Sequence, residues 1–277
     1  MSENRLRGNK KIKNQCKSVS QIEGGYTLYT RIKMKDILLI ISLIFVGQTL
    51  GCLIGLVKKP KETVLYGSLA FAASMMLGIS FFQLIPESLE ITPVYFVIIS
   101  FLAGIVTFRI IDRTLPHINP ELLKKEKPSI ERSVTMLVIG MALHNIPEGL
   151  AIGVGFALTP ALGITIAVGI AAQDVPENIA TIVPLYGLTK KKIKSFVITT
   201  ATIGFELLGF IFGYYFLKGM SLDLLGASLA LAAGFMTYIS VEELIPAAQI
   251  KQNLKTGLTG LILGLMCVLL ICFITKG

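Results

Sequence analysis

The sequence predicts an all-α membrane protein with eight transmembrane helices in a 3+2+3 inverted-repeat arrangement. Three observations carry this prediction. Only 16% of the 277 residues are charged and 53% are hydrophobic, whereas a soluble domain carries about 25% charged residues. Apolar segments long enough to cross a bilayer recur along the chain. Two pairs of these segments also match each other in sequence. The members of each pair lie an odd number of spans apart, so they cross the membrane in opposite directions.

Each predicted span is long enough for an apolar helix to cross the hydrocarbon core, which takes roughly 20 residues. Residues 1–35 precede the spans as a basic tail that can be disordered, and residues 36–277 form the eight-span domain. A long connection at residues 112–130 carries His117 and is predicted to be a flexible cytoplasmic loop. The spans are residues 37–57, 65–88, 93–111, 131–158, 161–187, 193–217, 222–248 and 255–275.

The positive charges predict both the partner and the orientation. The net charge of +9 does not indicate nucleic acid, because the Lys and Arg residues flank the apolar segments. We therefore expect a lipid bilayer as a partner and no nucleic acid. Nearly all cations of the spanning domain lie in the connections between spans 1–2, 3–4, 5–6 and 7–8. The positive-inside rule places these connections in the cytoplasm and both termini outside the cell membrane.

The basic tail at residues 1–35 disagrees with this orientation, because its Lys and Arg residues favour the cytoplasm. We hypothesise that Met34, just ahead of the first span, is an alternative start. Peptides from residues 1–33 in natively expressed protein would exclude it. No signal peptide is recognisable. The four cysteines form no CxxC pair, and three lie in apolar segments where inert buried thiols are expected.

Two internal repeats predict the inverted arrangement. Residues 68–88 align without gaps with residues 228–248, and 11 of 21 positions are identical, including the LIP triplets that end at Pro86 and Pro246. A shorter repeat aligns HNIPEG, which begins at His144, with QDVPEN, 29 residues later. The second and seventh spans, and the fourth and fifth, thus form antiparallel pairs. We expect the fourth and fifth spans to lie on an axis in the membrane plane.

Ligand-type side chains lie near the centres of three consecutive spans. Residues three and four apart share one face of a helix, so each of the two repeated motifs presents its polar groups in one direction. The seven residues are His144, Asn145 and Glu148 in the fourth span, Gln173, Asp174 and Glu177 in the fifth, and Glu206 in the sixth.

The four carboxylates in this set indicate bound positive charge. Each ionised carboxylate at mid-bilayer costs about 2.5–3.5 kcal/mol, and no Lys or Arg lies near the centre of any span. Protons, bound cations, or both must therefore neutralise them, and four carboxylates can balance two divalent cations. Imidazole, amide and carboxylate together suit Zn²⁺, Fe²⁺, Mn²⁺ or Cd²⁺. A single buried Glu or His is often only a packing residue, but seven on neighbouring spans argue against that explanation.

Two further groups of residues lie in or near the ends of these spans. Pro147 and Pro176 lie inside the repeated motifs, where each removes a helical N–H, and we expect broken helix lining a cavity there. Acidic residues also lie toward the ends of two spans, and these either concentrate cations or are solvated helix ends. They are Glu87, Glu90, Glu242 and Glu243.

At HNIPEG and QDVPEN the chain resembles the ZIP (Zrt/Irt-like) family of divalent metal transporters, over about residues 36–277. Gln173 and Asp174 are similar to the GufA-like bacterial branch, since many other ZIP proteins carry His-Glu there. The resemblance implies eight spans, extracytoplasmic termini and a homodimer. It also implies an elevator-like motion of spans 1, 4, 5 and 6 against spans 2, 3, 7 and 8.

The resemblance further implies how two cations would be held. Glu148, Glu177 and Glu206 would bridge them; His144 and Gln173 would complete one site, and Asn145 and Asp174 the other. Because an amide is a weaker ligand than imidazole, Gln173 implies a preference broader than strict Zn²⁺. The histidine-rich loop of the family is reduced here to His117, which argues against metal sensing by that loop.

We therefore expect import of divalent transition-metal cations toward the cytoplasm, with Zn²⁺ foremost and Fe²⁺, Mn²⁺ and Cd²⁺ as further candidates. The metal would be the transported substrate, and we expect no organic cofactor and no enzymatic activity. The alternative is a proton-coupled carrier of another solute that uses the same acids as a relay. An intramembrane metallohydrolase is disfavoured, because the sequence has no HExxH motif and no recognisable general base.

Overall fold

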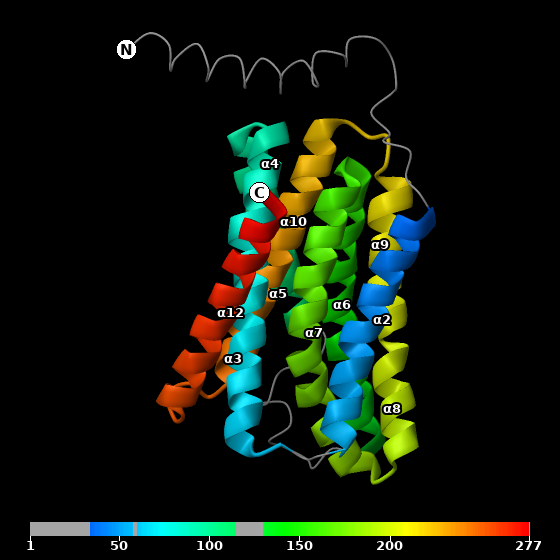
Figure 1. Ribbon diagram of the computed structural model, residues 1–277, viewed down its shortest axis with the longest axis vertical. Coiled ribbons are helices and arrows are strands. Elements are labelled where there is room, and N and C mark those ends of the chain that lie inside the picture. The colour runs from blue at the N-terminus through cyan, green and yellow to red at the C-terminus, as the bar shows by residue number, and fades with distance from the viewer. Residues whose placement is uncertain (1–33, 58–59, 115–129, 277) are drawn as a thin grey trace. The chain divides into compact units, whose positions relative to one another are not determined.

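The computed structural model describes residues 34–57, 60–114 and 130–276, and every regular element in these ranges is helical (Figure 1). Residues 35–277 form one compact unit. The predicted basic tail up to residue 33 lies outside the described ranges, as do most of the predicted cytoplasmic loop and His117.

Eight helical crossings follow one another along the described residues, and three of them contain a π-helical turn. Each predicted span agrees with a crossing to within three residues at either end, so the predicted all-α class is confirmed. The crossings are α2 (Met34–Val57); α3 (Glu62–Ile79) with η2 (Ser80–Leu84) and α4 (Ile85–Ile91); α5 (Val94–Thr114); α6 (Ile130–Leu158); α7 (Pro160–Thr189); α8 (Lys192–Ala201) with α9 (Ile203–Ile211) and η4 (Phe212–Phe216); α10 (Leu222–Ile239) with η5 (Ser240–Leu244) and α11 (Ile245–Ala247); and α12 (Leu254–Lys276).

Seven of these crossings are long and apolar enough to span a membrane. The exception is α7, which has 30 residues but carries Gln173, Asp174 and Glu177 along its middle. Burial separates central from peripheral helices. In α6, 78% of the most apolar window is buried, compared with 17% in α5 and 22% in α12. The polar helices α6 and α7 therefore lie inside the bundle, and the outer helices present apolar side chains to lipid.

Glycines let the central helices approach closely. A Cβ added at Gly51 of α2 would lie 2.4 Å from the carbonyl oxygen of Val175 on α7, and one at Gly149 of α6 would lie 1.9 Å from that of Glu206 on α9. Such contacts are typical of membrane helices that associate through small residues. The glycine of the HNIPEG motif thus permits the contact between α6 and α9.

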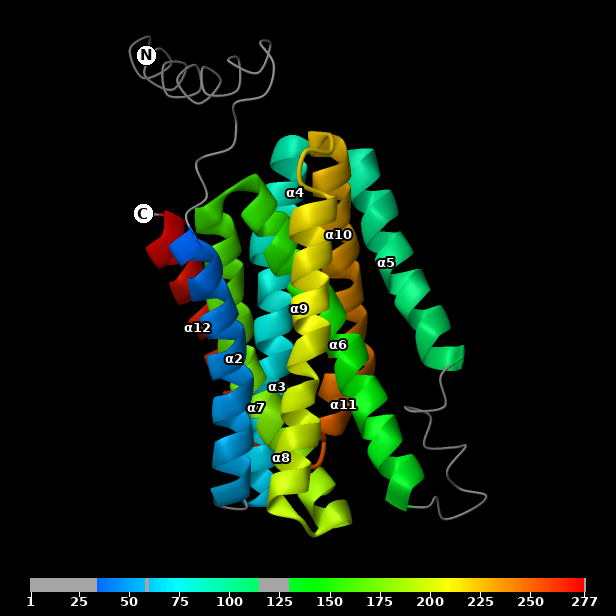
Figure 2. The same ribbon diagram turned by 90° about the vertical axis from the view of Figure 1, so that its right-hand side faces the viewer.

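The two copies of the longer repeat have the same local structure. In each copy an α-helix passes into a π-turn at a serine, whose hydroxyl donates to the carbonyl four residues earlier: Ser80 to Met76 (2.9 Å) and Ser240 to Met236 (2.7 Å). The proline of the LIP triplet follows each π-turn, since proline cannot donate in the helical pattern. Figure 2 shows α4 and α11, where the two copies end, toward opposite ends of the bundle.

The shorter repeat behaves differently from the prediction. Both α6 and α7 continue as uninterrupted helices through Pro147 and Pro176, so the expectation of broken helix at these prolines is wrong. A proline inside a helix removes one hydrogen bond, and neighbouring helices can hold the segment in helical form. The interruption lies instead in the sixth crossing, at Thr202 between α8 and α9.

Candidate metal centre

The predicted ligands lie in the interior of the bundle, where α6, α7 and α9 meet. Each of the seven predicted residues is at most 7% exposed. Three of them converge: Glu148, Asp174 and Glu177 each offer a carboxylate oxygen, and these oxygens all lie within 4.8 Å of one another. Because α6 and α7 both contribute, this carboxylate cluster joins the two copies of the shorter repeat.

Several oxygens of this cluster have no hydrogen-bond partner within the described part of the chain. They are Oε2 of Glu148, Oδ2 of Asp174 and both carboxylate oxygens of Glu177. A buried polar atom without a partner costs about 1–3 kcal/mol, and more when the group is charged. Native proteins seldom tolerate several such atoms together unless an ion, water or proton satisfies them. The unpartnered oxygens therefore indicate a site for positive charge.

Glu148 and Gln173 are joined across the two helices. The Gln173 side-chain amide donates to Oε1 of Glu148, and the carbonyl oxygen of that amide, Oε1, has no partner among the described residues. This contact fixes the orientation of both side chains. It leaves one oxygen on each side chain available to a cation.

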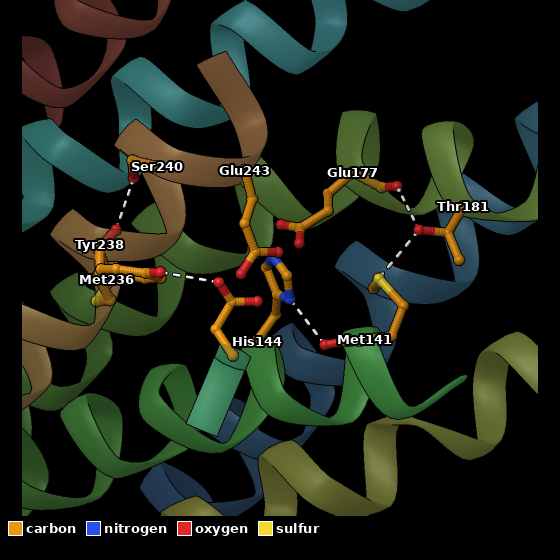
Figure 3. Close-up of polar contacts among 10 residues, drawn as sticks. Met141, His144, Glu177, Thr181, Met236, Tyr238, Ser240 and Glu243 are labelled. Carbon is orange, nitrogen blue, oxygen red and sulfur yellow. Dashed lines mark hydrogen bonds and ion pairs between the residues drawn. The ribbon is translucent and has the colours of Figure 1, made fainter. Parts of the chain in front are cut away.

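His144 is held at the edge of the cluster. Its Nδ1 lies 2.7 Å from the carbonyl oxygen of Gly140, one turn earlier on α6, and its Nε2 lies 3.3 Å from Oε2 of Glu243 on η5. Figure 3 shows the carboxyl groups of Glu177 and Glu243 next to the imidazole. His144 thus lies beside both the central cluster and a further carboxylate. To bind a cation through Nε2, it would exchange its contact with Glu243.

Glu243 is not a solvated helix end. Its side chain is 11% exposed, and Tyr238, on the preceding turn, donates to Oδ2 of Asp112 at 2.8 Å. Asp112 belongs to α5, so acidic groups from α5 and η5 lie near one another beside His144. Glu242, the next residue before Glu243, is exposed and agrees with the simpler expectation. Tertiary contact separates two adjacent acids that look equivalent in the sequence.

Asn145 faces the helix interruption. Its Nδ2 donates to the backbone carbonyl of Thr202 at 3.0 Å. The Thr202 hydroxyl in turn donates to the carbonyl of Thr199 at 2.7 Å. These bonds satisfy backbone groups that the break between α8 and α9 releases. Asn145 therefore anchors the start of α9, the helix that carries Glu206 in its first turn.

Glu206 has a partner that the sequence reasoning missed. Gln48 of α2 donates from its amide nitrogen Nε2 to Oε2 of Glu206, and Oε1 of Glu206 has no partner in the described ranges. Gln48 is fully buried. A lone amide side chain in the otherwise apolar first span, beside Gly47 and Gly51, was the signal that could have identified it.

A separate groove of about 850 Å³ lies between α3, α7 and α12 and is not this site. Its lining is mostly apolar and includes Phe71, Val175, Ile179 and Leu263. Val175 and Ile179 belong to α7 but lie on a different face of that helix from Asp174 and Glu177. The groove therefore lacks the ligands that a cation needs.

Known proteins share this sequence pattern. Residues 124–275 match the family of ZIP zinc transporters. The chain is also 34% identical over 214 residues to proteins named zinc transporter ZupT from Salmonella newport (strain SL254) and Salmonella typhimurium (strain LT2). Each match covers 74% of this chain and 82% of the relative. The matched family segment contains all seven predicted ligands.

Proposed function

The chain belongs to the ZIP family of zinc transporters, and from this premise we propose that it imports divalent transition-metal cations, chiefly Zn²⁺, through the carboxylate cluster. The observation that carries the proposal is the convergence of Glu148, Asp174 and Glu177, whose oxygens lie within 4.8 Å of one another and are in part without partners. A divalent cation supplies the charge that these buried groups require.

The charge of the site supports two cations rather than one. The three carboxylates of the cluster and that of Glu206, buried on the neighbouring α9, would together neutralise two divalent ions. We propose that Glu148, Glu177 and Glu206 are shared, that His144 and Gln173 complete one site, and that Asn145 and Asp174 complete the other. The Gln173–Glu148 hydrogen bond supports the first grouping, because it brings two members of that set into contact.

The ligand types support a broad selectivity. Oxygen ligands from carboxylates and an amide accept Mn²⁺ and Fe²⁺ as well as Zn²⁺ and Cd²⁺, and the single imidazole of His144 favours the borderline ions. We propose Zn²⁺ as the main cargo with these ions as competitors. A metal transported in this way is a substrate rather than a cofactor.

Helix packing supports the proposed elevator motion. Wherever a glycine Cβ would approach the backbone of another described helix within 3.0 Å, the two helices belong to one of two groups. Such contacts join α2, α6, α7 and α9 to one another as the first group; in the second group they join α3 to α12 and α5 to α10. We propose that the first group, which carries the cluster, slides against the second. A homodimer formed through the second group would hold it fixed during this motion.

We propose an exit route toward the cytoplasm on the basis of the predicted orientation. The Lys and Arg distribution predicts that the connection after α11 faces the cytoplasm. A cation that leaves His144 meets Glu243 next, since these side chains lie 3.3 Å apart. Glu243 lies on the turn that leads to α11. We therefore propose that Glu243 receives the cation on its way to the cytoplasm.

The proposal is tested by Zn²⁺ flux into proteoliposomes with Mn²⁺, Fe²⁺ and Cd²⁺ as competitors. We expect Glu148→Ala and Glu177→Ala each to reduce the Zn²⁺ flux at least about a hundredfold. Each substitution removes one charge-assisted contact to the cation, which is worth about 3 kcal/mol. Glu62→Ala is the matched control, because Glu62 is an exposed acid at the start of α3. Full Zn²⁺ flux in both cluster variants, or solute-coupled proton flux without metal, would refute metal transport by this cluster.

A further inference from the structure

Gln48 occupies a fixed position beside the cluster. On either side of it along α2, Gly47 and Gly51 contact the α7 backbone at Ala171 and Val175, where an added Cβ would lie 2.7 Å and 2.4 Å from the respective carbonyl oxygens. These two contacts flank the segment of α7 that carries Gln173 and Asp174. The backbone of α2 therefore cannot shift away without losing its closest packing, and Gln48 stays fully buried.

The amide of Gln48 is only half satisfied. Its nitrogen donates to Oε2 of Glu206, while its carbonyl oxygen Oε1 has no partner in the described part of the molecule. The free oxygen of Glu206, Oε1, is also without a partner there. Two acceptors at the same contact thus lack a donor. A cation, or a water molecule bound to it, would satisfy both.

We propose, on the basis of the metal transport proposed above, that Gln48 belongs to the metal site as a positioning residue. Its N–H group holds one oxygen of Glu206 and thereby turns the other oxygen toward the cation, and its own carbonyl oxygen faces the cation or a water on it. Residues that orient metal ligands in this way typically contribute 10–100-fold to affinity. Gln48 would act on cation affinity through Glu206.

A glutamine suits this position for reasons of charge. The four carboxylates of the site already balance two divalent cations, so an additional acid would leave an uncompensated negative charge in the membrane. A Lys or Arg would hold Glu206 but repel the cargo. The amide supplies one donor and one acceptor without net charge.

A simpler role for Gln48 is interhelical packing alone, since amide side chains join helices in membranes. The two roles differ in a measurable way. A packing residue changes the stability of the metal-free protein and leaves the affinity of the folded protein for metal unchanged. A positioning residue changes that affinity.

The test compares full-length Gln48→Leu with wild type and with Cys52→Ala. Leucine keeps most of the volume and removes both polar atoms. Cys52 is the matched control, because it lies one turn further along α2, is equally buried, and contacts Asn178 rather than a proposed ligand. We expect Gln48→Leu to bind Zn²⁺ 10–100-fold more weakly in equilibrium titration and Cys52→Ala to bind it as wild type does.

Wild-type affinity in Gln48→Leu would overturn the proposal, whether or not the metal-free protein is less stable.

Gln48→Glu tests the position of the carbonyl oxygen. We expect this substitution to lower the Tm of the metal-free protein, since the new carboxylate lies beside that of Glu206. We also expect a larger rise in Tm on addition of Zn²⁺, because the bound cation relieves the repulsion between the two carboxylates. An unchanged rise would show that this oxygen does not face the metal. Failure of wild type to bind Zn²⁺ would instead refute the proposed function itself.

Discussion

The two central helices carry the same motif but hold it in different ways. On α6, each predicted ligand has a partner in the protein: His144 contacts Glu243, Asn145 contacts Thr202, and Glu148 accepts from Gln173. On α7, both carboxylate oxygens of Glu177 and one buried oxygen of Asp174 have no partner among the described residues. The two motifs align residue by residue in the sequence, yet among the described residues four of their buried oxygens without a partner lie on α7 and one, Oε2 of Glu148, lies on α6.

This difference indicates that the α6 residues contribute mainly to the stability of the metal-free site and the α7 residues mainly to cation binding. The hydrogen bonds of α6 fix the geometry before a cation arrives, which lowers the cost of binding. The carboxylates of α7 lower the stability of the metal-free protein, because they are buried without compensation. Such a local conflict is expected at a functional site, where a ligand supplies the missing contact.

The largest expected effect is that of Glu177→Gln, which removes a charge from α7. We expect the Tm of the metal-free protein to rise, because an unpartnered buried carboxylate becomes a neutral amide, by about 2–4 °C for each kcal/mol gained. The rise in Tm on addition of Zn²⁺ should disappear. Differential scanning fluorimetry with and without Zn²⁺ measures both quantities. A lower Tm in the metal-free variant would show that Glu177 is stabilised by the protein after all.

The next effect concerns the contact that places Glu206 beside α6. In Gly149→Ala the new Cβ would lie 1.9 Å from the Glu206 carbonyl oxygen, so α6 and α9 must separate at a cost of about 1–3 kcal/mol. We expect a lower Tm and reduced Zn²⁺ flux. Gly204→Ala is the matched control on α9, since nothing lies within 4 Å of its Cβ, and it should be neutral or slightly stabilising. Equal effects of both variants would contradict the close approach.

A loss of stability of similar size is expected for Asn145→Ala on α6. The carbonyl of Thr202 loses its donor at the break between α8 and α9, which costs about 1–3 kcal/mol if the carbonyl stays buried. The metal-free Tm should fall, whereas the same measurement on Glu177→Gln should show a rise. Changes in Tm of opposite sign would support the difference between α6 and α7, and a rise in Tm in both variants would contradict it.

The smallest effect is expected for Gln173→His, which gives α7 an imidazole at the position that matches His144. Imidazole favours Zn²⁺ over Mn²⁺ more strongly than an amide does. We expect Mn²⁺ to compete less well for Zn²⁺ flux, by up to about tenfold, or 1.4 kcal/mol. Competition assays in proteoliposomes measure this change, and unchanged competition would show that Gln173 does not contact the cation.

Much of the fold could be predicted, because lipid imposes a simple rule on the chain. A helix must be about 20 residues long and apolar to cross the hydrocarbon core, and the eight predicted spans agree with the eight crossings. The candidate ligands could also be predicted, since acids near the centre of a span are costly and rare. The assignment of all seven residues to metal binding stays a prediction, although Glu148, Asp174 and Glu177 do converge.

Local reasoning failed where a backbone or side-chain group depends on a neighbouring helix. Proline disfavours helix in any sequence, yet α6 continues through Pro147. The interruption occurs at Thr202, which is neither proline nor glycine, whereas Gly204 lies inside α9. Glu242 and Glu243 are adjacent and chemically identical, and only the contact with His144 distinguishes them.

The sequence by itself determined the number and approximate limits of the spans, the two repeats and the chemical types of the candidate ligands, because each depends on residues close together in the chain. Only the tertiary structure decided which polar groups meet. Gln48 reaches Glu206 across 158 positions of the chain, and glycine contacts between α2 and α7 and between α6 and α9 bring the two together. Such contacts depend on how helices pack, and hydropathy along a single helix does not encode them.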